Sequence, residues 1–517
     1  MSCGEAVYAV SDLELLRRYL MLGNENGSYY VNQNDLASQH ASCVDRLLFA
    51  DPGGALAAME DLETRVYKKD YLLAALARFC VAGPQRKRSY ELAMRACRTP
   101  THLFQFIDLY EKACKAANSS TGWNRMHKEA VCAWYMDKPV LQLAYLVTKY
   151  RSRNGWNHKD VLRLAHPNAS GSLHDLLFAY VTKGYSQFYD KIVSTEGTEV
   201  LKEYLNAVEA LASTDQPEEA ARLIECFGLV REHVPTSLLS AQEVWRALSK
   251  KMPMVALVRN LNKLSAVGAF LGYPDVLESV VGQLSSEEAI VRSGLHPLQV
   301  LVALNTYSKG KGEKGSMTWT PHPRVTDALG KAFRLAFKNV EPTNKRLLLA
   351  LDVSGSMTCT SVCGIEGLMA SQVAVAMSTV FLAREPFCTV MGFADTFREL
   401  GVSKDLSLEE NIARAYTNTF GSTDVSLPFE WALQNEKAID AFVVFTDSET
   451  NCGRSRPADA LRSYREKTGI DAKLVVVGLS SNRFTVADPN DRGMMDIAGF
   501  DPDAPAILRD FLQQPAP

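Results

Sequence analysis

Oxygen-bearing side chains recur in three short runs of the C-terminal third of the chain. The runs are Asp-x-Ser-x-Ser at residues 352–356, Gly-Ser-Thr-Asp at residues 421–424 and Thr-Asp at residues 446–447. Carboxylate and hydroxyl oxygens are hard ligands, which suit Mg²⁺ or Mn²⁺ far better than zinc or copper. We therefore expect a divalent cation, Mg²⁺ or Mn²⁺, to be held by Asp352, Ser354, Ser356, Thr423 and Asp447.

The same runs give little support for catalysis. Neither serine lies in a Gly-x-Ser-x-Gly turn, the aspartates do not form an Asp-x-Asp pair, and no histidine stands beside them in the sequence to act as a base. We expect no enzyme, although a polar loop that binds only water remains an alternative. Cys359 and Cys363 follow directly, but no second Cys or His pair answers them, so we do not expect zinc there.

Positive charge is concentrated in residues 145–166, where five Lys and Arg face a single Asp and three aromatic residues are interleaved. Lys149 and Arg153 are four residues apart, which predicts one shared helix face, and Gly155 is a plausible helix end. Cations on such a face could neutralise phosphates of a nucleic acid, and neighbouring aromatic rings could stack on unpaired bases. The alternative is a solvated helix face with Trp156 packed in the core.

A second helix is predicted directly afterwards. Asn157 is a plausible N-cap, with Asp160 three residues later. The spacing of Lys159, Arg163 and His166 puts them on one polar face, whereas the expected apolar stripe consists of Val161, Leu164 and Ala165. The candidate RNA-binding residues of the two helices are Lys149, Arg153, Lys159, Arg163 and His166.

Two kinds of secondary structure must position these groups. Residues 10–310 show apolar positions at three- and four-residue spacing with short polar breaks, which indicates an α-solenoid or an irregular helical domain. Short β-branched runs at residues 346–352, 388–395, 441–447 and 472–479 alternate with helical patterns, which is typical of a doubly wound α/β domain. Such a domain binds ligands beyond the carboxyl ends of its strands. We expect domains at residues 1–341 and 342–517.

Composition limits the partners and the cellular compartment of the protein. The 517 residues carry a net charge of −3, divided as −7 over residues 342–517 and +4 over residues 1–341, so a polyanionic partner would favour the helical part. No apolar run is long enough for a membrane helix, and we expect no export signal and no membrane partner. We therefore expect the protein in the cytoplasm, with the nucleus as a second compartment, as a monomer with reduced cysteines.

The oxygen-ligand runs resemble the metal-ion-dependent adhesion site of von Willebrand factor A domains, over residues 342–517. The resemblance implies that Ser354, Ser356 and Thr423 contact the ion directly or through water. It also implies that Asp352 and Asp447 act through waters or by hydrogen bonds to the hydroxyls. One coordination position would remain for an acidic group of a protein partner.

Most of the chain resembles the Ro autoantigen family, the TROVE-domain RNA-binding proteins. The matching runs are CRTPTHLFQFI (97–107), LVTKYRSRNGWNHKDVLRLAH (146–166), LVREHVPTSLLSAQEVWRAL (229–248), MVALVRNLNKL (254–264) and FTVADPNDRGMMDIAGFD (484–501). The resemblance implies a ring of HEAT-like repeats closed by the A domain, binding of small non-coding Y RNAs on its outer surface, and capture of single-stranded ends of misfolded RNAs in RNA quality control. It transfers RNA contacts to Lys149, Arg153 and His166. A protein-interaction scaffold that binds acidic partners at the metal site is the alternative.

Overall fold

The computed structural model describes residues 10–23, 28–30, 42–64, 69–117, 122–186, 197–312, 316–362, 367–417, 423–447, 456–480, 487–488, 490–499 and 504–513. They divide into two compact units. We call Ala37–Met252 with Val267–Val276 the helical unit, and Met1–Leu36, Pro253–Ala266 and Leu277–Pro517 the mixed unit. Within the described ranges no helix has the length and hydrophobicity required to span a membrane.

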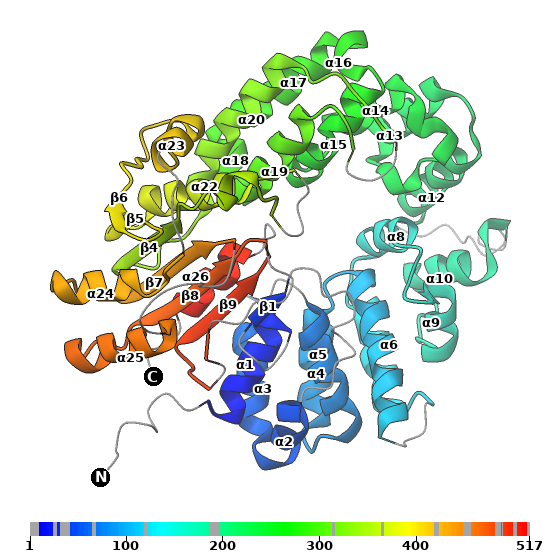
Figure 1. Ribbon diagram of the computed structural model, residues 1–517. Helices are drawn as coiled ribbons and strands as arrows, with labels where there is room; N and C mark the ends of the chain where they lie inside the picture. The colour runs from blue at the N-terminus through cyan, green and yellow to red at the C-terminus, as the bar shows by residue number, and fades with distance from the viewer. Residues whose placement is uncertain are drawn as a thin grey trace. The chain divides into compact units, whose positions relative to one another are not determined.

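The helical unit is built from short helices joined by short turns (Figure 1). Its elements are α2 (Ser42–Ala50), α3 (Pro52–Leu62), α4 (Lys69–Ala82), α5 (Arg86–Ala96), α6 (Pro100–Ala116), α7 (Arg125–Met136), α8 (Val140–Lys149), β2 (Ser152–Arg153), β3 (Trp156–Asn157), α9 (His158–Ala165), α10 (Leu173–Lys183), α12 (Thr198–Ser213), α13 (Pro217–Phe227), η2 (Arg231–His233), η3 (Thr236–Ser240), α14 (Gln242–Lys250) and α16 (Ala269–Gly272). The helix pattern expected from the sequence is confirmed for this region.

Neighbouring helices of the helical unit pack in succession. α4 packs on α5 and α6, and α13 packs on α12 and α14. The helices bury apolar stripes at three- and four-residue spacing, as Leu103, Phe106 and Tyr110 show on α6. Pro100 and Pro217 begin α6 and α13, where a missing N–H costs no intrahelical hydrogen bond.

The mixed unit contains further helices and one large sheet. Its helices are α1 (Asp12–Leu22), α15 (Met254–Ala266), α18 (Glu287–Ser293), α19 (Pro297–Ser308), α20 (Pro323–Leu335), η4 (Ala336–Asn339), α21 (Ser356–Cys359), α22 (Ala370–Arg384), α23 (Leu408–Ala415), α24 (Leu427–Gln434), α25 (Pro457–Thr468) and α26 (Ala504–Gln513), and α17 (Pro274–Ser285) continues into it from the helical unit. Its strands are β1 (Ser28–Tyr30), β4 (Leu347–Asp352), β5 (Cys388–Phe393), β6 (Phe397–Glu399), β7 (Ala441–Thr446), β8 (Lys473–Gly478) and β9 (Met494–Ala498).

The sheet has the order β1-β9-β8-β7-β4-β5-β6. All neighbouring strands are parallel except the pair β5 and β6. All four strands predicted from the sequence are present as β4, β5, β7 and β8. The predicted doubly wound domain is confirmed. The strand β1 was not predicted, and it adds residues 28–30 to a sheet otherwise formed by residues 347–498.

Both faces of the central strands are buried, which explains their continuous apolar sequence. Alternate residues such as Leu348, Phe442 and Leu474 join one core cluster with residues of α24 and α25. α22 contacts β4 and β7, and it lies on the other side of the sheet in Figure 1. The chain passes from β4 to β5 on one side and later to β7 on the other. This reversal beside β4 is the point at which doubly wound sheets bind their ligands.

Candidate nucleic-acid interface and candidate metal centre

The two cations predicted to share one helix lie on different elements. α8 ends at Lys149, and the following residues form the antiparallel hairpin β2–β3, which carries Arg153. The turn residues Asn154 and Gly155 have φ angles of 52° and 77°. Asn-Gly is strongly favoured in two-residue hairpin turns because both positions need positive φ. The shared helix face was therefore a wrong prediction, and Gly155 turns a hairpin instead of ending a helix.

The helix predicted after the hairpin is confirmed as α9. The side-chain oxygen of Asn157 accepts a hydrogen bond from the Asp160 amide at 2.9 Å, which is the predicted N-cap. Lys159 and Arg163 are exposed one turn apart on this helix. His166 is exposed as well, but it follows the helix as its C-cap, in a left-handed conformation with φ of 54°.

The apolar side of α9 differs from the prediction at one position. Val161 and Ala165 are buried as expected, and Leu162 is buried with them. Leu164 is 40% exposed, so its place in the apolar stripe was wrongly predicted. At 3.6 residues per turn Leu164 lies above Asp160, on the polar side of the helix. An apolar side chain thus stands exposed beside the cations.

Three cations of this surface form no ion pairs with described carboxylates. Arg153, Lys159 and Arg163 take part in no ion pair with any carboxylate in the described ranges, whereas other exposed arginines of the helical unit do, as Arg125 with Glu129 and Arg222 with Glu219. Unpaired cations remain available to an anionic ligand. We call Lys149, Arg153, Lys159, Arg163 and His166 the cationic surface.

Lys149 is the most enclosed member of the cationic surface. It is half-buried, and its Nζ donates to the Tyr145 hydroxyl at 3.2 Å and lies 5.0 Å from the centre of the Tyr150 ring. Burial alone would lower the pKa of Lys149, but the hydrogen bond to Tyr145 and the nearby acidic groups outweigh it and raise the pKa. Lys149 therefore stays charged at neutral pH.

A buried hydrogen-bond network holds the end of α8 that carries Lys149. His233 accepts from the Val230 amide through Nδ1 at 3.1 Å, so its Nε2 carries the proton and donates to Thr148 Oγ1 at 3.0 Å. Thr148 in turn donates to the Ala144 carbonyl at 2.8 Å. Burial, with a smaller contribution from nearby arginine, lowers the pKa of His233 to about 4. The neutral imidazole thus fixes the last turn of α8.

Trp156 of the hairpin belongs to an aromatic cluster. It is half-buried, and its ring centre lies 5.8 Å from that of Trp123 at an angle of 45°. Trp123 in turn meets the buried His127 edge-on, with ring centres 4.7 Å apart. These contacts anchor the hairpin against the segment before α7. Trp156 is therefore neither fully in the core nor fully available for stacking.

The five residues predicted to hold a divalent cation meet beyond the carboxyl ends of β4 and β7. Ser354 Oγ and Ser356 Oγ lie 3.0 Å apart, and Ser356 Oγ donates to Asp447 Oδ1 at 3.0 Å. Asp352 accepts from Thr446 Oγ1 at 2.7 Å. It also accepts from Thr423 Oγ1 at 3.5 Å and from the Ser354 amide at 2.9 Å. The residues converge as their places at the strand ends predict.

The donor set fits a hard divalent cation. Hydroxyl and carboxylate oxygens are ligands that Mg²⁺ accepts, and those of Ser354, Ser356 and Asp447 are joined by hydrogen bonds of 3.0 Å. Burial raises the pKa of Asp352, and the adjacent carboxylate of Asp447 raises it further, although hydrogen bonds from hydroxyls oppose both effects. A cation would relieve this repulsion. No cluster of three His, Cys, Asp or Glu exists among the described residues, so the site depends on its hydroxyls.

Four residues named from the sequence remain, Gly421, Ser422, Cys359 and Cys363. Gly421 and Ser422 lie outside the described residues, as does Cys363. Cys359 ends the short helix α21 and is exposed, with its sulfur 3.7 Å from the Thr358 hydroxyl. It forms no part of the oxygen cluster.

Family models of known proteins match both the helical part of the chain and the α/β part. The family model of the TROVE domain matches residues 54–306, and that of the Ro60 von Willebrand factor A domain matches residues 346–512. RNA-binding protein RO60 of Deinococcus radiodurans is 37% identical over 516 residues, which cover 99% of this chain and 94% of that protein. The chain belongs to the Ro60 family.

Further relatives of the Ro60 family support this placement. RNA-binding protein RO60 of Caenorhabditis elegans is 34% identical over 580 residues, covering 99% of this chain and 89% of that protein. The crystal structure of the Deinococcus radiodurans RO (RSR) protein superposes with a TM-score of 0.89 at 35% identity, over 97% of this chain and 99% of that one. The family resemblance and fold class inferred from the sequence are confirmed.

Sequence reasoning missed two features of the cationic surface. The hairpin has a local signal, because Asn-Gly stands between Arg153 and Trp156. The hydrogen bond between His233 and Thr148 has no local sequence signal, because 85 residues separate the two along the chain.

Proposed function

We propose that this protein is the RNA-binding subunit of a small ribonucleoprotein, and that the cationic surface contacts small structured RNAs of the Y type. The observation that carries the proposal is the exposure of Arg153, Lys159 and Arg163 without carboxylate partners among the described residues. These cations lie within the TROVE match, and the relatives are named RNA-binding proteins. Affinity for RNA grows with each phosphate neutralised.

The second part of the proposal is capture of single-stranded ends of misfolded RNAs, as a step in RNA quality control in the cytoplasm. Its support is membership of the Ro60 family together with the resemblance seen in the sequence. Unpaired ends expose bases that stack on aromatic rings, a contact that tolerates any sequence.

The direct test is to isolate the protein from its native cells and to sequence the RNA that accompanies it. We expect a small set of structured non-coding RNAs, recovered in lower amount with a variant in which Arg153 and Arg163 are changed to Gln. Recovery of bulk cellular RNA in proportion to its abundance, unchanged by the substitutions, would contradict the proposal. An Arg222→Gln variant serves as control, because Arg222 is already paired with Glu219.

We also propose that the oxygen cluster holds Mg²⁺ or Mn²⁺ through Ser354, Ser356 and Thr423, with Asp352 and Asp447 supporting them. The bound cation would supply a positive centre able to accept a carboxylate of an acidic protein partner. The favouring observation is the convergence of hydroxyl and carboxylate oxygens from Ser354, Ser356 and Asp447 at the strand ends. The scaffold function is thus a second candidate, compatible with RNA binding.

Treatment of a cell extract separates the two functions. Partners bound through the metal centre should survive RNase and be released by EDTA, whereas partners held through RNA should leave with RNase. Purified protein should show no Mg²⁺-dependent hydrolysis of RNA or of phosphate esters. Turnover that disappears in an Asp352→Ala variant would overturn the non-catalytic assignment.

A further inference from the structure

A pocket separate from the cationic surface and from the metal centre opens between α15 and α19 of the mixed unit. Its volume is about 220 Å³, smaller than the ~300 to ~1,000 Å³ of sites for drug-sized ligands. Residues at helical spacing face it from both sides: Val255, Arg259 and Asn262 on α15, and Gln299, Ala303 and Thr306 on α19. A pocket of this size encloses one small ring system, so a larger ligand would extend past its rim, where Arg259 is exposed.

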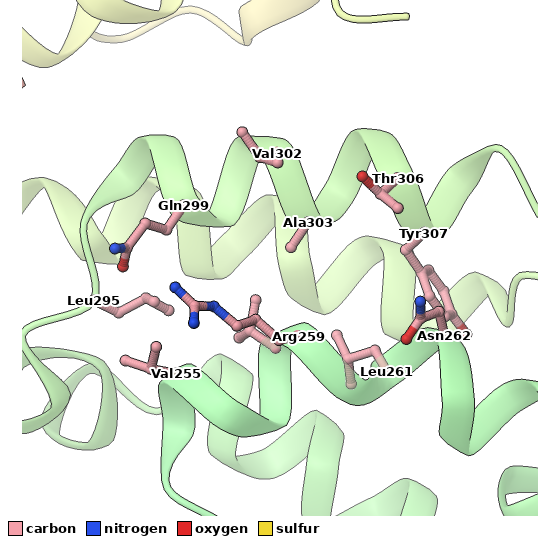
Figure 2. Close-up of a pocket in the computed structure, with 11 residues that line it drawn as sticks. Val255, Arg259, Leu261, Asn262, Leu295, Gln299, Val302, Ala303, Thr306 and Tyr307 are labelled. Carbon is pink, nitrogen blue, oxygen red and sulfur yellow. The ribbon is translucent and has the colours of Figure 1, made fainter. Parts of the chain in front are cut away.

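The pocket has two polar ends and an apolar middle (Figure 2). Arg259 and Gln299 point into one end, and Asn262 and Thr306 lie at the other. Leu261 and Ala303 lie between them. Such a division suits a ligand that is anionic at one end, flat and partly apolar in the middle, and capable of hydrogen bonding at its far edge.

Electrostatics restrict the ligand further. Arg259 is exposed and is the only charged side chain among the described lining residues. It forms no ion pair with a described carboxylate. A guanidinium offers a planar fork that matches phosphate oxygens. The lining therefore favours an anion and excludes a cation.

The neutral polar groups point to a nucleobase. The Asn262 Oδ1 accepts from the Lys263 amide at 2.8 Å and the Gln299 Oε1 accepts from the His296 amide at 3.4 Å. Each side-chain amide therefore offers its N–H groups as donors, which suit the carbonyl and ring-nitrogen acceptors at the edge of a base. The aliphatic side chains between the ends offer apolar contact to the faces of a flat ring. The Tyr307 ring closes the end near Asn262 and is held there, since its hydroxyl lies 2.7 Å from Ser265 Oγ and accepts from the His322 amide at 2.9 Å.

We propose that this pocket binds one nucleoside monophosphate unit, with the phosphate on Arg259 and the base between Ala303 and the amide of Asn262. The same chemistry is offered by a free nucleotide and by an unpaired residue of an RNA chain. In the second case the inference rests on the proposed RNA function and deepens it, because the pocket adds a contact for single strands through residues other than those of the cationic surface.

The experiment uses the full-length protein and calorimetric titration with four probes: uridine monophosphate, adenosine monophosphate, uridine and inorganic phosphate. We expect saturable binding of at least one monophosphate, at least tenfold tighter than that of uridine or phosphate. Arg259→Ala should weaken that binding at least tenfold, and Ala303→Leu should abolish it by filling the pocket. Arg292→Ala, an exposed arginine of α18 paired with Glu288, is the control and should change nothing.

A second arm identifies the source of the nucleotide. An eight-residue single-stranded RNA carrying 4-thiouridine should crosslink to α15 or α19, and a free monophosphate should compete for it if both use the pocket. Crosslinking without competition assigns the pocket to RNA chains, and monophosphate binding without crosslinking assigns it to free nucleotides.

Two results would overturn the inference. One is the absence of both monophosphate binding and crosslinking, and the other is binding that Arg259→Ala and Ala303→Leu leave unchanged. If phosphate alone binds as well as the monophosphates, the base contact is refuted. Titration of structured RNA in parallel distinguishes failure of this inference from failure of the proposed RNA function. Binding of structured RNA depends on the cationic surface and should be unchanged by Arg259→Ala.

Discussion

Replacement of three exposed cations by neutral residues should flatten the salt dependence of RNA binding by a calculable amount. Arg153, Lys159 and Arg163 are exposed and form no ion pair with described carboxylates, so each is free to neutralise one phosphate. Each phosphate contact contributes roughly 0.7 to 0.9 to the slope of log affinity against log salt. Changing all three to Gln should therefore lower the slope by about 2 to 3.

This slope sets an expected change in affinity. A rise from 50 to 200 mM salt is fourfold. It should lower the RNA affinity of the native protein about 20- to 40-fold more than it lowers that of the triple variant. The assay is a titration of one structured small RNA at four salt concentrations, followed by fluorescence anisotropy. The melting temperature of each variant is measured in parallel, to show that the fold is retained.

A matched control removes the same charge from paired arginines. Arg222, Arg246 and Arg292 are exposed, but each already bonds a carboxylate, of Glu219, Asp275 and Glu288 respectively. Their combined change to Gln should leave the slope within about 1 of the native value. Equal slopes for the two triple variants would refute the reasoning, because RNA would then respond to net charge and not to the cationic surface.

Three further predictions concern single positions. Burial lowers the pKa of His233 from 6.5 to about 4, so the unfolded chain binds more protons than the folded one between these values. The free energy of unfolding should fall as pH drops through this window, by up to about 3 kcal/mol for this residue, and His233→Gln should flatten the pH dependence of the melting temperature. Gly155→Val should weaken structured-RNA binding while Gly155→Asn should not. A Cβ atom at Gly155 would meet no atom within 4 Å, so the φ of 77°, which Asn tolerates better than Val, is what opposes substitution. Equal binding by both variants would contradict this. Asp447→Ala should weaken Mn²⁺ binding at least tenfold by calorimetry yet leave the melting temperature in EDTA nearly unchanged, and a variant that cannot fold would show that the carboxylate is structural.

The sequence was sufficient wherever local pattern decides structure. The buried strands β4, β7 and β8 are short, mostly apolar runs because helices cover the central sheet, and the runs themselves predict them. β5 was predicted in the same way, although only its last three residues are buried. The same holds for the N-cap Asn157 and for the convergence of Asp352 with Asp447, since parallel strands end at one edge of a sheet.

Other features depend on long-range packing and could not be predicted. The burial of Leu162 in place of Leu164 follows from how α9 is turned against its neighbours, because both leucines are equally apolar in the sequence. A hairpin forms where the sequence predicted a helix end. The positive φ angles at Asn154 and Gly155 give a tight turn, although the spacing of Lys149 and Arg153 is also compatible with a helix. β1 has only three residues, too few for a periodic pattern, and its partner β9 lies more than 450 residues away.

The pairing of β1 with β9 affects how the molecule can be divided experimentally. A fragment that begins at residue 342 would lose residues 28–30 and leave the backbone N–H and C=O groups of β9 open along one border of the sheet. Uncovered borders of this kind recruit strands from other chains. Self-association of the excised domain would then be a consequence of the cut, and adding back a short peptide with the sequence around Ser28–Tyr30 should suppress it.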